Sequence, residues 1–514
     1  MANVIVCCDG TWNTADERDE GLPCPTNVAK ISNALADTDS QGNPQKKYYH
    51  SGVGTDGNVL AKFAGGAVGD GLDKNIKSAY GWLCQNYHAE DNIYIFGFSR
   101  GAYTARYVAG MICSYGLADL SAPGLHDDEI WKIVDRIFDA DKNCSDLQTL
   151  SDIKFFNRSQ GQSPAGTTPV HFLGVWDTVG ALGIPSDMAV ISLLDSLKPH
   201  QFQNTKLSDK VLHARHAVAM DERRQSFTPT FWTDPDHHPD VKQIWFAGVH
   251  SDVGGGYVQT GLSDIALKWM IEEAAAWGLN FRSKILDQLS PDPRGALHDS
   301  CTGVFKALRT LPRCVPAVTD IQPAASAFHP SVIDRWSNPP IEQSPYWATK
   351  LLPKGGKIVV DVFALPHWNE TAVYLEEGVE YEFKAEGQWL DGSVKCDPSG
   401  PTSGQFQFGE IAQAAGSALG QAEKLYQALS HNTQADFWWT KRVEAYNWFA
   451  LIGVIANGSG TDADGDPTPH ETFLIGKGTS YAPKASGYLY CFANDAWQTY
   501  GNNRGSVSLT IQRT

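Results

Sequence analysis

The segment most informative about the fold is IYIFGFSRGAYTARYVAGMI, Ile93–Ile112. It begins with an apolar run of strand length, passes through the pentapeptide GFSRG, and continues with apolar residues at helical spacing. A serine with a glycine two places to either side, between a strand and a helix, is typical of a strained turn that exposes a nucleophile. A structurally neutral strand-to-helix turn is the alternative. We predict that Ser99 is a nucleophile at the end of a sheet.

The sequence around this stretch alternates strand patterns with helix patterns. Strands that are almost continuously apolar and alternate with helices indicate a mostly parallel sheet with helices on both faces, an α/β fold. The predicted strands are VIVCCDG, QKKYYHSGVG, NIYIFGF, HFLGVWDTVG and VKQIWFAGVHSDVGGG, and the predicted helices are DGLDKNIKSAYGWLCQNYHAED, SRGAYTARYVAGMICSYG and DIALKWMIEEAAAWG.

The pattern changes at about residue 355. Short strands with turn signals between them follow, which is typical of an all-β sandwich. Pro and Gly accumulate in WSNPPIEQSPYWATKLLPKGGK, so we place a domain boundary there, between residues 1–350 and residues 355–514. The predicted strands of the second domain are KIVVDVFAL, VEYEFKAEGQWL, YNWFALIGVIANG, HETFLIG, GYLYCFAND and GSVSLTIQR.

Composition and charge exclude several classes of protein. The chain has 514 residues, 42% of them apolar, and a formal net charge of -17, which gives no electrostatic reason to bind nucleic acid or an anionic membrane surface. It has no run of 18 apolar residues, so we predict no transmembrane helix. The ten cysteines lack metal-ligand spacing and indicate buried thiols in a reducing compartment. Because no classical signal peptide is recognisable, we expect a cytoplasmic location in the producing cell, with signal-independent export as the alternative.

Two further residues complete the chemistry that Ser99 requires. A nucleophilic serine needs a base, and the base needs an orienting acid. Asp177 and His250 each follow a predicted strand, and the carboxyl ends of parallel strands meet at one edge of a sheet. We therefore predict a triad of Ser99, Asp177 and His250, in the chain order that this architecture uses. The alternatives are that Asp177 caps a turn and that His250 is a core histidine bonded to Asp252. Asp252 is also the substitute acid, although its closeness to His250 favours a role in shaping the loop.

Acyl transfer also needs hydrogen-bond donors for the oxyanion. The backbone N–H of Arg100, directly after the nucleophile, is one candidate. Thr11, in the loop after the first strand, is the other, with Gly10 allowing the backbone to approach. Asp9 either fixes this loop by accepting from backbone amides or from Arg100, or forms an ordinary Asp-Gly turn.

The last segment of the chain gathers oxygen donors. Asp495, Thr499, Asn502 and Asn503 lie within nine positions, and hard oxygen ligands close together on a loop suit Ca²⁺. A hairpin rich in turn residues is the alternative. TDADGDP, at residues 461–467, resembles the start of an EF-hand loop but lacks the glutamate at its twelfth position, so we predict an acidic turn there.

Seven segments of the first domain together resemble a known family. They resemble the α/β-hydrolase domain of the type VI secretion lipase effectors, of the class-one phospholipase type, over roughly residues 1 to 350. The resemblance implies an α/β-hydrolase fold and hydrolysis of a lipid ester, with Ser99 as nucleophile, Asp177 as acid and His250 as base. The segments are CCDGTWN, SGVGT, GFSRGAYTAR, GVWDTVG, VAMDERRQSF, FAGVHSDVGGGY and HPSVIDRW.

The second domain resembles the calcium-dependent galactose-binding lectins of the PA-I type, over about residues 355 to 514. In that family one Ca²⁺ bridges the protein and sugar hydroxyls. The resemblance implies side-chain ligands from Asp495, Asn502 and Asn503, a backbone carbonyl from Thr499, and another backbone ligand at Asp391. The segments that carry it are FKAEGQWLDG, FALIGVIANGSG, HETFLIGKGTSYAPKASGYLY and YCFANDAWQTYGNNRGSVSLTI.

One insertion departs from the lectin pattern. The stretch from Lys395 to Lys441 replaces a loop that lines the sugar pocket in that family, and it contains a predicted helix at about residues 408–430. Small residues on one face of this helix suit packing on the hydrolase domain, and its Gln and Glu content favours packing over insertion into a lipid interface.

The sequence therefore predicts a serine esterase or lipase, with a lipid or phospholipid ester as substrate and no cofactor for the hydrolysis itself. A lectin-like domain with Ca²⁺ would dock it to a glycan or partner. The alternatives are a carbohydrate esterase that deacylates a bound glycan, and a glycan-binding protein with a degenerate hydrolase domain.

Overall fold

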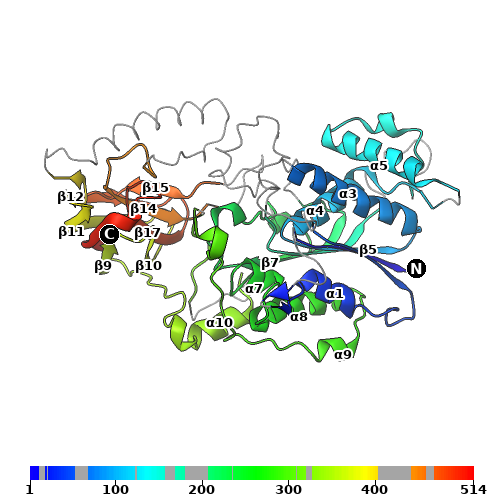
Figure 1. Ribbon diagram of the computed structural model, residues 1–514, viewed down its shortest axis with the longest axis horizontal. Helices are drawn as coiled ribbons and strands as arrows, with labels where there is room; N and C mark the ends of the chain where they lie inside the picture. The colour runs from blue at the N-terminus through cyan, green and yellow to red at the C-terminus, as the bar shows by residue number, and fades with distance from the viewer. Residues whose placement is uncertain are drawn as a thin grey trace.

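The described residues form two parts that lie side by side, a parallel α/β part and an antiparallel β part (Figure 1). Three predicted features lie outside these residues, namely Thr11, the helix at about 408–430 and the acidic turn at 461–467. The computed structural model describes residues 1–10, 18–19, 21–52, 67–121, 124–156, 168–179, 207–233, 235–307, 309–319, 327–402, 441–458 and 468–514.

A six-stranded sheet is the centre of the α/β part, with the strand order β4-β1-β5-β6-β7-β8. Every neighbouring pair in it is parallel. The carboxyl ends of all six strands therefore meet at one edge. The strands are β1 (Asn3–Cys8), β4 (Gln45–His50), β5 (Asn92–Phe98), β6 (Val170–Trp176), β7 (Val211–Ala219) and β8 (Val241–Phe246). A separate pair is formed by β2 (Arg18–Asp19) and β3 (Leu22–Pro23).

Helices cover both faces of this sheet, as the sequence predicts. Alternate residues of β1 enter different hydrophobic clusters, Val4 and Val6 one cluster, Ile5 and Cys7 the other. The first cluster includes α3 (Ala67–Asn86), α4 (Arg100–Tyr115) and α5 (Asp127–Lys142), which lie above the sheet in Figure 1. The other face carries α1 (Asn27–Ala34), α7 (His250–Gly254), α8 (Gly261–Ala276), α9 (Ser283–Leu286) and α10 (Pro330–Ser337).

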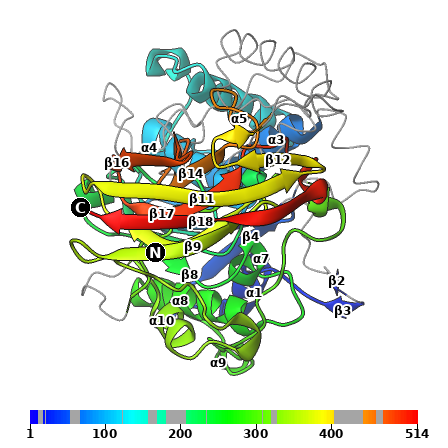
Figure 2. The ribbon, with the colours of Figure 1, turned by 90° about the vertical axis from the view of Figure 1, so that its left-hand side faces the viewer.

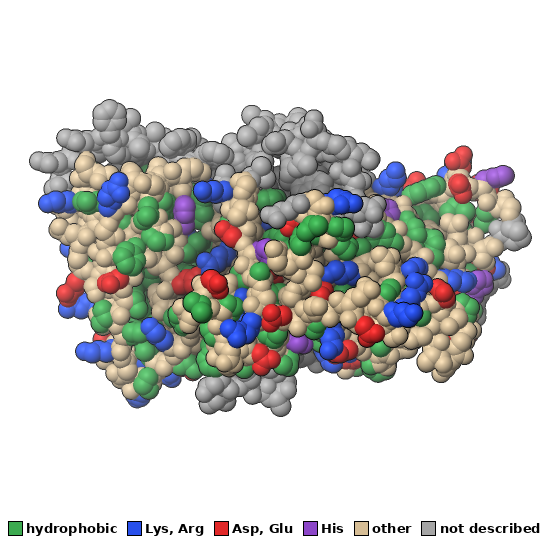
Figure 3. Space-filling view, turned by 60° about the horizontal axis from the view of Figure 1, so that its bottom comes forward, with side chains coloured by type: hydrophobic (Ala, Val, Ile, Leu, Met, Phe, Trp, Pro, Cys, Tyr) green, Lys and Arg blue, Asp and Glu red, His purple; other side chains and the backbone are tan. Residues whose placement is uncertain are grey.

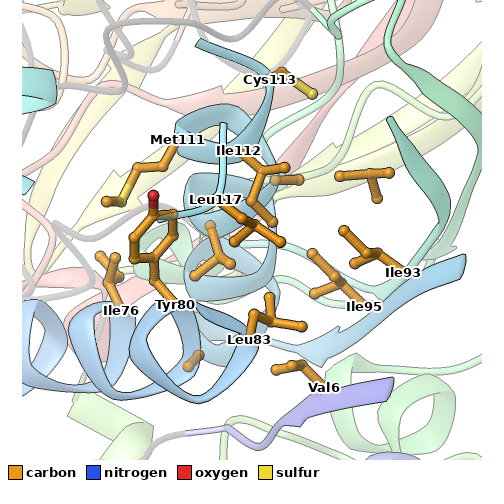
Figure 4. Packing of buried hydrophobic residues seen from close by; sticks show 14 of the residues in the cluster. Val6, Ile76, Tyr80, Leu83, Ile93, Ile95, Met111, Ile112, Cys113 and Leu117 are labelled. Atoms are coloured by element: carbon orange, nitrogen blue, oxygen red, sulfur yellow. The ribbon is translucent and has the colours of Figure 1, made fainter. Parts of the chain in front are cut away.

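Helix α4 packs its small residues against the sheet. Ala102, Ala105 and Ala109 recur at helical spacing and are buried. The helix ends at Gly116, whose φ of 84° suits glycine and whose carbonyl accepts a hydrogen bond from the Tyr80 hydroxyl at 2.7 Å. Figure 4 shows the cluster between α3, α4 and strands β1 and β5. Each fully buried aliphatic side chain of this kind contributes about 1.5–3 kcal/mol.

Strand β7 is not predicted from the sequence. Its pattern, VLHARHAVA, places Arg215 and His216 where a central strand normally carries apolar residues. Both are buried. Arg215 pairs with Asp240 at 2.9 Å and with Glu273, and these partners offset the cost of burying its charge.

The second part consists of two antiparallel sheets that enclose one core, and Figure 2 shows the sheet with β11, β18 and β9 in front. One sheet has the order β10-β17-β14-β15, made of β10 (Asn369–Leu375), β17 (Gly487–Ala493), β14 (Leu451–Ala456) and β15 (Glu471–Leu474). The other has the order β13-β12-β11-β18-β9, with β16 paired to β11, made of β13 (Gly400–Pro401), β12 (Val394–Asp397), β11 (Tyr381–Asp391), β18 (Asn503–Arg513), β9 (Lys357–Phe363) and β16 (Gly478–Tyr481).

The two parts have separate hydrophobic cores. Tyr346 packs in the core of the α/β part, whereas Leu352 packs in the core between the two antiparallel sheets. Among the residues that the structure describes, none of the helices combines the length and the apolar character that crossing a bilayer requires.

Candidate functional site

Ser99 lies at the junction of β5 and α4 in a strained conformation. Its φ of 57° and ψ of -124° are rarely adopted by residues with a side chain. Within the described helix its hydroxyl makes no capping hydrogen bond, which is unusual for a serine at an N-cap. The side chain is therefore not used to stabilise α4.

The two glycines of the pentapeptide are required by close backbone contacts. A Cβ on Gly97 would lie 2.4 Å from the carbonyl oxygen of Gly101. A Cβ on Gly101 would lie 2.2 Å from the carbonyl oxygen of Cys8, at the end of β1. The G-x-S-x-G pattern therefore brings the start of α4 against the loop that follows β1.

Asp177 follows β6 and accepts four hydrogen bonds. Its Oδ1 accepts from the backbone N of Ala219 at 2.9 Å and from Nη1 of Arg313 at 2.6 Å. Its Oδ2 accepts from Nδ1 of His250 at 2.6 Å and from Nη2 of Arg313 at 3.0 Å. Burial by itself raises the pKa of the Asp177 carboxyl, but the charge of Arg313 and the bond to His250 lower that pKa well below its usual range. Asp177 is thus a buried carboxylate with a full set of donors.

His250 is the first residue of α7, shortly after β8. Its ring contacts two aromatic rings, with centroid distances of 4.6 Å to Phe98 and 4.9 Å to Phe227. Phe98 directly precedes Ser99 in the chain, so this contact brings the imidazole beside the serine turn. Burial lowers the pKa of His250, and the hydrogen bond and charge of Asp177 oppose this only in part.

The hydrogen bond to Asp177 fixes the tautomer of His250. A carboxylate only accepts, so Nδ1 carries the proton and donates it. The other ring nitrogen, Nε2, is then a lone-pair acceptor. This arrangement is able to take a proton from a neighbouring hydroxyl and return it.

A second buried carboxylate supports the backbone of His250. Oε2 of Glu222 accepts from the His250 backbone N at 3.2 Å. The same carboxylate accepts from Nε of Arg224 at 2.9 Å and from the Ser300 hydroxyl at 2.8 Å. Burial raises the pKa of Glu222, but the Arg224 hydrogen bonds and charge outweigh it and lower the pKa to about 2. Glu222 is therefore an anion that holds the loop in which the imidazole lies.

Arg313, Glu222 and Arg224 are not among the site residues predicted from the sequence. Glu222 and Arg224 lie in the segment VAMDERRQSF, whose run of charges after an apolar stretch could have drawn attention to them. Arg313 lies in LPRCVP, where no local pattern points to a site, and 136 residues separate it from Asp177.

Asp252 contacts a different histidine. Its Oδ1 bonds Nδ1 of His298 at 2.6 Å, and its Oδ2 accepts from the backbone N of Val249 at 3.1 Å. The hydrogen bonds from the imidazole of His250 and from Arg313 go to Asp177 instead. In the described residues Asp252 therefore shapes the loop around α7.

Asp9 stabilises the loop after β1. Its Oδ1 accepts from the backbone N of Gly10 at 2.7 Å, and its Oδ2 accepts from the hydroxyls of Thr26 at 2.7 Å and Tyr49 at 2.6 Å. Arg100 is the first residue of α4 and directly follows Ser99. The structure thus brings Gly10 and Arg100 to the same edge of the sheet as Asp177 and His250.

The oxygen-rich residues predicted near the C-terminus also come together. Asp495 Oδ1 accepts from the Thr499 hydroxyl at 2.6 Å, and its Oδ2 accepts from Nδ2 of Asn503 at 3.0 Å. Asp391 Oδ1 accepts from Nδ2 of Asn502 at 3.1 Å. The pairing of β11 with β18 sets Asp391 opposite Asn503, which brings the two carboxylates to one end of the sheet.

The electrostatics of this cluster suit a hard cation. Burial raises the pKa of Asp391 to about 6, and the charge of Asp495 adds to that rise. Burial also raises the pKa of Asp495. The Oδ1 atom of Asn503 is buried, and no described residue donates a hydrogen bond to it. The cluster thus offers two carboxylates and neutral oxygens, a donor set that fits Ca²⁺. The described residues contain no group of three or more His, Cys, Asp and Glu that could hold a metal ion.

Solved structures resemble parts of this chain. A crystal structure of an uncharacterized protein from Pseudomonas aeruginosa covers 57% of this chain and 49% of its own, at 18% identity and a TM-score of 0.35. The structure of the Tle1 effector bound to the VgrG spike of the type 6 secretion system covers 51% of this chain and 52% of its own, at 19% identity and a TM-score of 0.32. The EclA N-terminal domain, described as a PllA-like lectin, covers 30% of this chain and 95% of its own, at 16% identity and a TM-score of 0.19.

A curated relative matches about half of this chain. An uncharacterized protein of Saccharomyces cerevisiae is 31% identical over 271 residues, which are 49% of this chain and 35% of the relative. The chain therefore spans about a third of the length of the curated relative that it matches.

Residues 2–273 match the family model for the catalytic domain of type VI secretion phospholipase effectors of the Tle1-like type. The match covers more than half of the chain and includes Ser99, Asp177 and His250. By this catalytic domain the chain belongs to the Tle1-like phospholipase effector family.

Proposed function

We propose that this protein is a serine hydrolase of the α/β-hydrolase fold that cleaves a carboxylic ester of a lipid, most naturally a phospholipid. The observation that carries the proposal is the 2.6 Å hydrogen bond between Nδ1 of His250 and Asp177. It lies at the sheet edge where Ser99 is held in a strained turn. A lipid substrate is supported by membership of a phospholipase effector family.

In the first half of the reaction, the Ser99 Oγ attacks the ester carbonyl carbon while Nε2 of His250 takes the hydroxyl proton. The tetrahedral intermediate then collapses. The bond to the leaving alcohol breaks, and that alcohol's oxygen receives the proton from Nε2. The acyl group remains bound to Ser99 as an ester.

In the second half, a water molecule gives a proton to Nε2 of His250 and attacks the acyl carbon. The bond to the Ser99 oxygen breaks, the carboxylic acid leaves, and Ser99 regains its proton. Asp177 stays ionised throughout and stabilises the imidazolium that forms in each half. The backbone N–H groups of Arg100 and Thr11 are the proposed donors to the oxyanion.

The experiment for this proposal has two arms. Labelling with a fluorophosphonate probe should modify wild-type protein at Ser99, and Ser99→Ala should abolish both labelling and turnover. Assay of phospholipid vesicles beside acetylated glycans then distinguishes lipid hydrolysis from glycan deacylation. Turnover by Ser99→Ala equal to that of the wild type would refute the serine mechanism, and activity confined to the glycans would refute the lipid substrate.

The antiparallel part is proposed to be a lectin-like sandwich that binds Ca²⁺ and docks the enzyme to a glycan or partner. Asp495 would supply negative charge, and so would the Asp391 carboxylate, in place of the backbone ligand expected at Asp391 from the resemblance. Asn502, Asn503 and the Thr499 carbonyl would supply the neutral oxygens. The Oδ1 atom of Asn503, which is buried and accepts no hydrogen bond from the described part of the chain, supports this assignment. When bound, Ca²⁺ would neutralise two carboxylates that burial disfavours as anions. Calcium analysis of the purified protein and a glycan array with and without EDTA test this part.

Membership of an effector family also supports a further proposal, that the protein is exported without a signal peptide through a type VI apparatus. Secretion by the native host should then be lost when that apparatus is inactivated. Continued secretion in its absence would contradict this route.

A further inference from the structure

Residues 309–319, called the strap below, run between the two parts of the molecule without helix or strand. The strap follows a short 3-10 helix, Gly303–Ala307, of the α/β part. On its α/β side, Arg313 contacts Asp177, and the backbone N of Leu311 donates to the carbonyl of Arg223 at 2.7 Å. The strap therefore carries the cation that pairs with the proposed triad acid.

The antiparallel part, whose strands lie between Lys357 and Arg513 and which is called the sandwich below, contacts the same strap one peptide unit from Arg313. Nε2 of His470 donates to the carbonyl oxygen of Pro312 at 2.6 Å. Nδ1 of His470 accepts from the backbone N of Gly458 at 2.8 Å, so both ring nitrogens are engaged and the imidazole is neutral. Burial also lowers the pKa of His470. The carbonyl that His470 holds belongs to the peptide bond whose nitrogen is that of Arg313.

Two further side chains of the sandwich extend this contact along the strap. Nε1 of Trp368 donates to the carbonyl of Thr310 at 3.1 Å, and the hydroxyl of Tyr488 accepts from the backbone N of Val318 at 2.9 Å. Tyr488 belongs to β17, and Trp368 directly precedes β10. These strands form the sheet that lies behind β11, β18 and β9 in Figure 2, on the side of the α/β part.

The two parts also meet around Arg313 itself. A small cleft between them has walls from both. The α/β part contributes Glu222, Arg224 and Arg313 to it, and the sandwich contributes Gly458, Thr468 and His470.

Arg313 holds the carboxylate of Asp177 through two hydrogen bonds. Its two Nη atoms reach both carboxylate oxygens, and they also donate to the carbonyls of Ala219 and Phe227. A bidentate arginine of this kind fixes the plane of a carboxylate as well as neutralising it. The position of Arg313 therefore sets the direction in which Asp177 meets His250.

We propose that Arg313 is a positioning residue for Asp177 and that the sandwich holds it in place through His470 and Trp368. The proposal rests on the serine hydrolase function proposed above. It makes the C-terminal part a component of the catalytic machinery in addition to any docking role.

The pH profile distinguishes this role from a merely structural one. Among the described residues, the charged groups that face His250 and Asp177 are Glu222, Arg224 and Arg313. The buried His216 is neutral because burial lowers its pKa to about 3. Without Arg313 the charge of Asp177 acts fully on His250 and favours the imidazolium, or Asp177 itself takes up a proton. Both changes move the acidic limb of kcat/KM to higher pH, by about one unit or more.

The experiment uses the full chain and a short soluble ester, p-nitrophenyl butyrate. Arg313→Gln should lower kcat and move the acidic limb of the kcat/KM profile to higher pH. Arg313→Lys should show a smaller shift, because lysine keeps the positive charge. His470→Leu and Trp368→Phe should each shift the limb in the same direction by less. Tyr381→Phe is the matched control, because it removes one hydrogen bond of the sandwich, from the backbone N of Glu376, away from the strap.

A double variant tests whether His470 acts through Arg313. The limb of Arg313→Gln/His470→Leu should coincide with that of Arg313→Gln alone, because the sandwich contact then has nothing to position. The inference would be overturned if the acidic limb of kcat/KM lay at the wild-type pH in both Arg313→Gln and His470→Leu. The hydrolase function would still stand in that case, provided that Ser99→Ala is inactive. Should Arg313→Gln not fold, Arg313→Lys and His470→Leu decide by the same measurement. Turnover by Ser99→Ala would instead remove the hydrolase proposal itself.

Discussion

Ser99 occupies a backbone conformation that costs free energy, of the order of 1–3 kcal/mol for a residue with a Cβ. Ser99→Ala keeps that cost and removes the nucleophile, so kcat should fall on the order of 10³-fold or more. Ser99→Gly should be equally inactive but more stable than Ser99→Ala by about 1 kcal/mol, because relief of strain exceeds the entropy cost of glycine. Melting curves of the two variants check this. A glycine variant that melts below the alanine variant would show that the turn is not strained.

Asp177 and Asp252 provide a matched comparison of two buried carboxylates near His250. Asp177→Asn retains the shape but lets His250 adopt the wrong tautomer, so kcat should fall by about 10⁴-fold. Asp252→Asn changes a contact to His298 and should have a much smaller effect on kcat. Steady-state kinetics of both variants on one soluble ester decide the matter. A larger loss in Asp252→Asn would mean that the acid has been assigned incorrectly.

At the scale of the element, helix α4 contains two glycines with opposite requirements. A Cβ on Gly101 would overlap the carbonyl oxygen of Cys8, whereas a Cβ on Gly110 meets no atom within 4 Å. Gly101→Ala should therefore displace the helix from β1 and lose both stability and activity. Gly110→Ala should instead stabilise the protein by about 1 kcal/mol through its higher helix propensity. Denaturant unfolding of both variants checks the pair, and a stable, active Gly101→Ala would contradict the contact.

The end of strands β11 and β18 carries the proposed Ca²⁺ site, and its pH behaviour follows from the raised pKa of Asp391. An acid whose pKa is higher in the folded state, about 6 against an ordinary value of 3.8, binds its proton first when folded. Without Ca²⁺, the contribution of Asp391 to stability therefore rises as the pH falls from about 6 to 3.8. Protons and Ca²⁺ compete for the same carboxylates, so Ca²⁺ affinity should decline below about pH 6.

At the scale of the whole molecule, Ca²⁺ should stabilise the folded protein by mass action. A hundredfold excess over Kd corresponds to about 2.7 kcal/mol, and Asp495→Asn should remove most of that gain. Turnover of a small soluble ester should survive chelation, because none of the proposed Ca²⁺ ligands is among the described residues through which the sandwich contacts the strap. The measurement is a melting curve with EDTA and with Ca²⁺ at pH 7, for wild type and Asp495→Asn. An unchanged wild-type midpoint would contradict a metal site.

The surface and the charge of the molecule bear on how it meets a lipid. The formal net charge is -17, and on the face in Figure 3 acidic and basic side chains are interspersed. Long-range attraction to an anionic bilayer is therefore not expected. Binding of the protein to a particular membrane would depend on short-range contacts instead. This is consistent with the proposed docking role of the sandwich.

The local features of this protein can be predicted from its residues alone. The strained turn at Ser99 can be predicted from the G-x-S-x-G pattern. Its two glycines are required by close backbone contacts, one within the turn and one with the end of β1. The alternation of strands and helices is visible because burial on both faces of a parallel sheet leaves continuous apolar runs. The same reasoning brought Asp177 and His250 to one sheet edge.

The pairing of the buried charges follows from the fold and cannot be predicted from spacing along the chain. The sequence pattern does not predict strand β7, because Arg215 interrupts its apolar run and the partners of Arg215, Asp240 and Glu273, lie elsewhere in the chain. The role of Arg313 cannot be predicted from the sequence either. Its contact with Asp177 spans 136 residues and depends on the path of the strap along the sandwich. A buried charge needs a partner, but the order of the strands and the docking of the two parts, not the spacing along the chain, determine which residue that partner is.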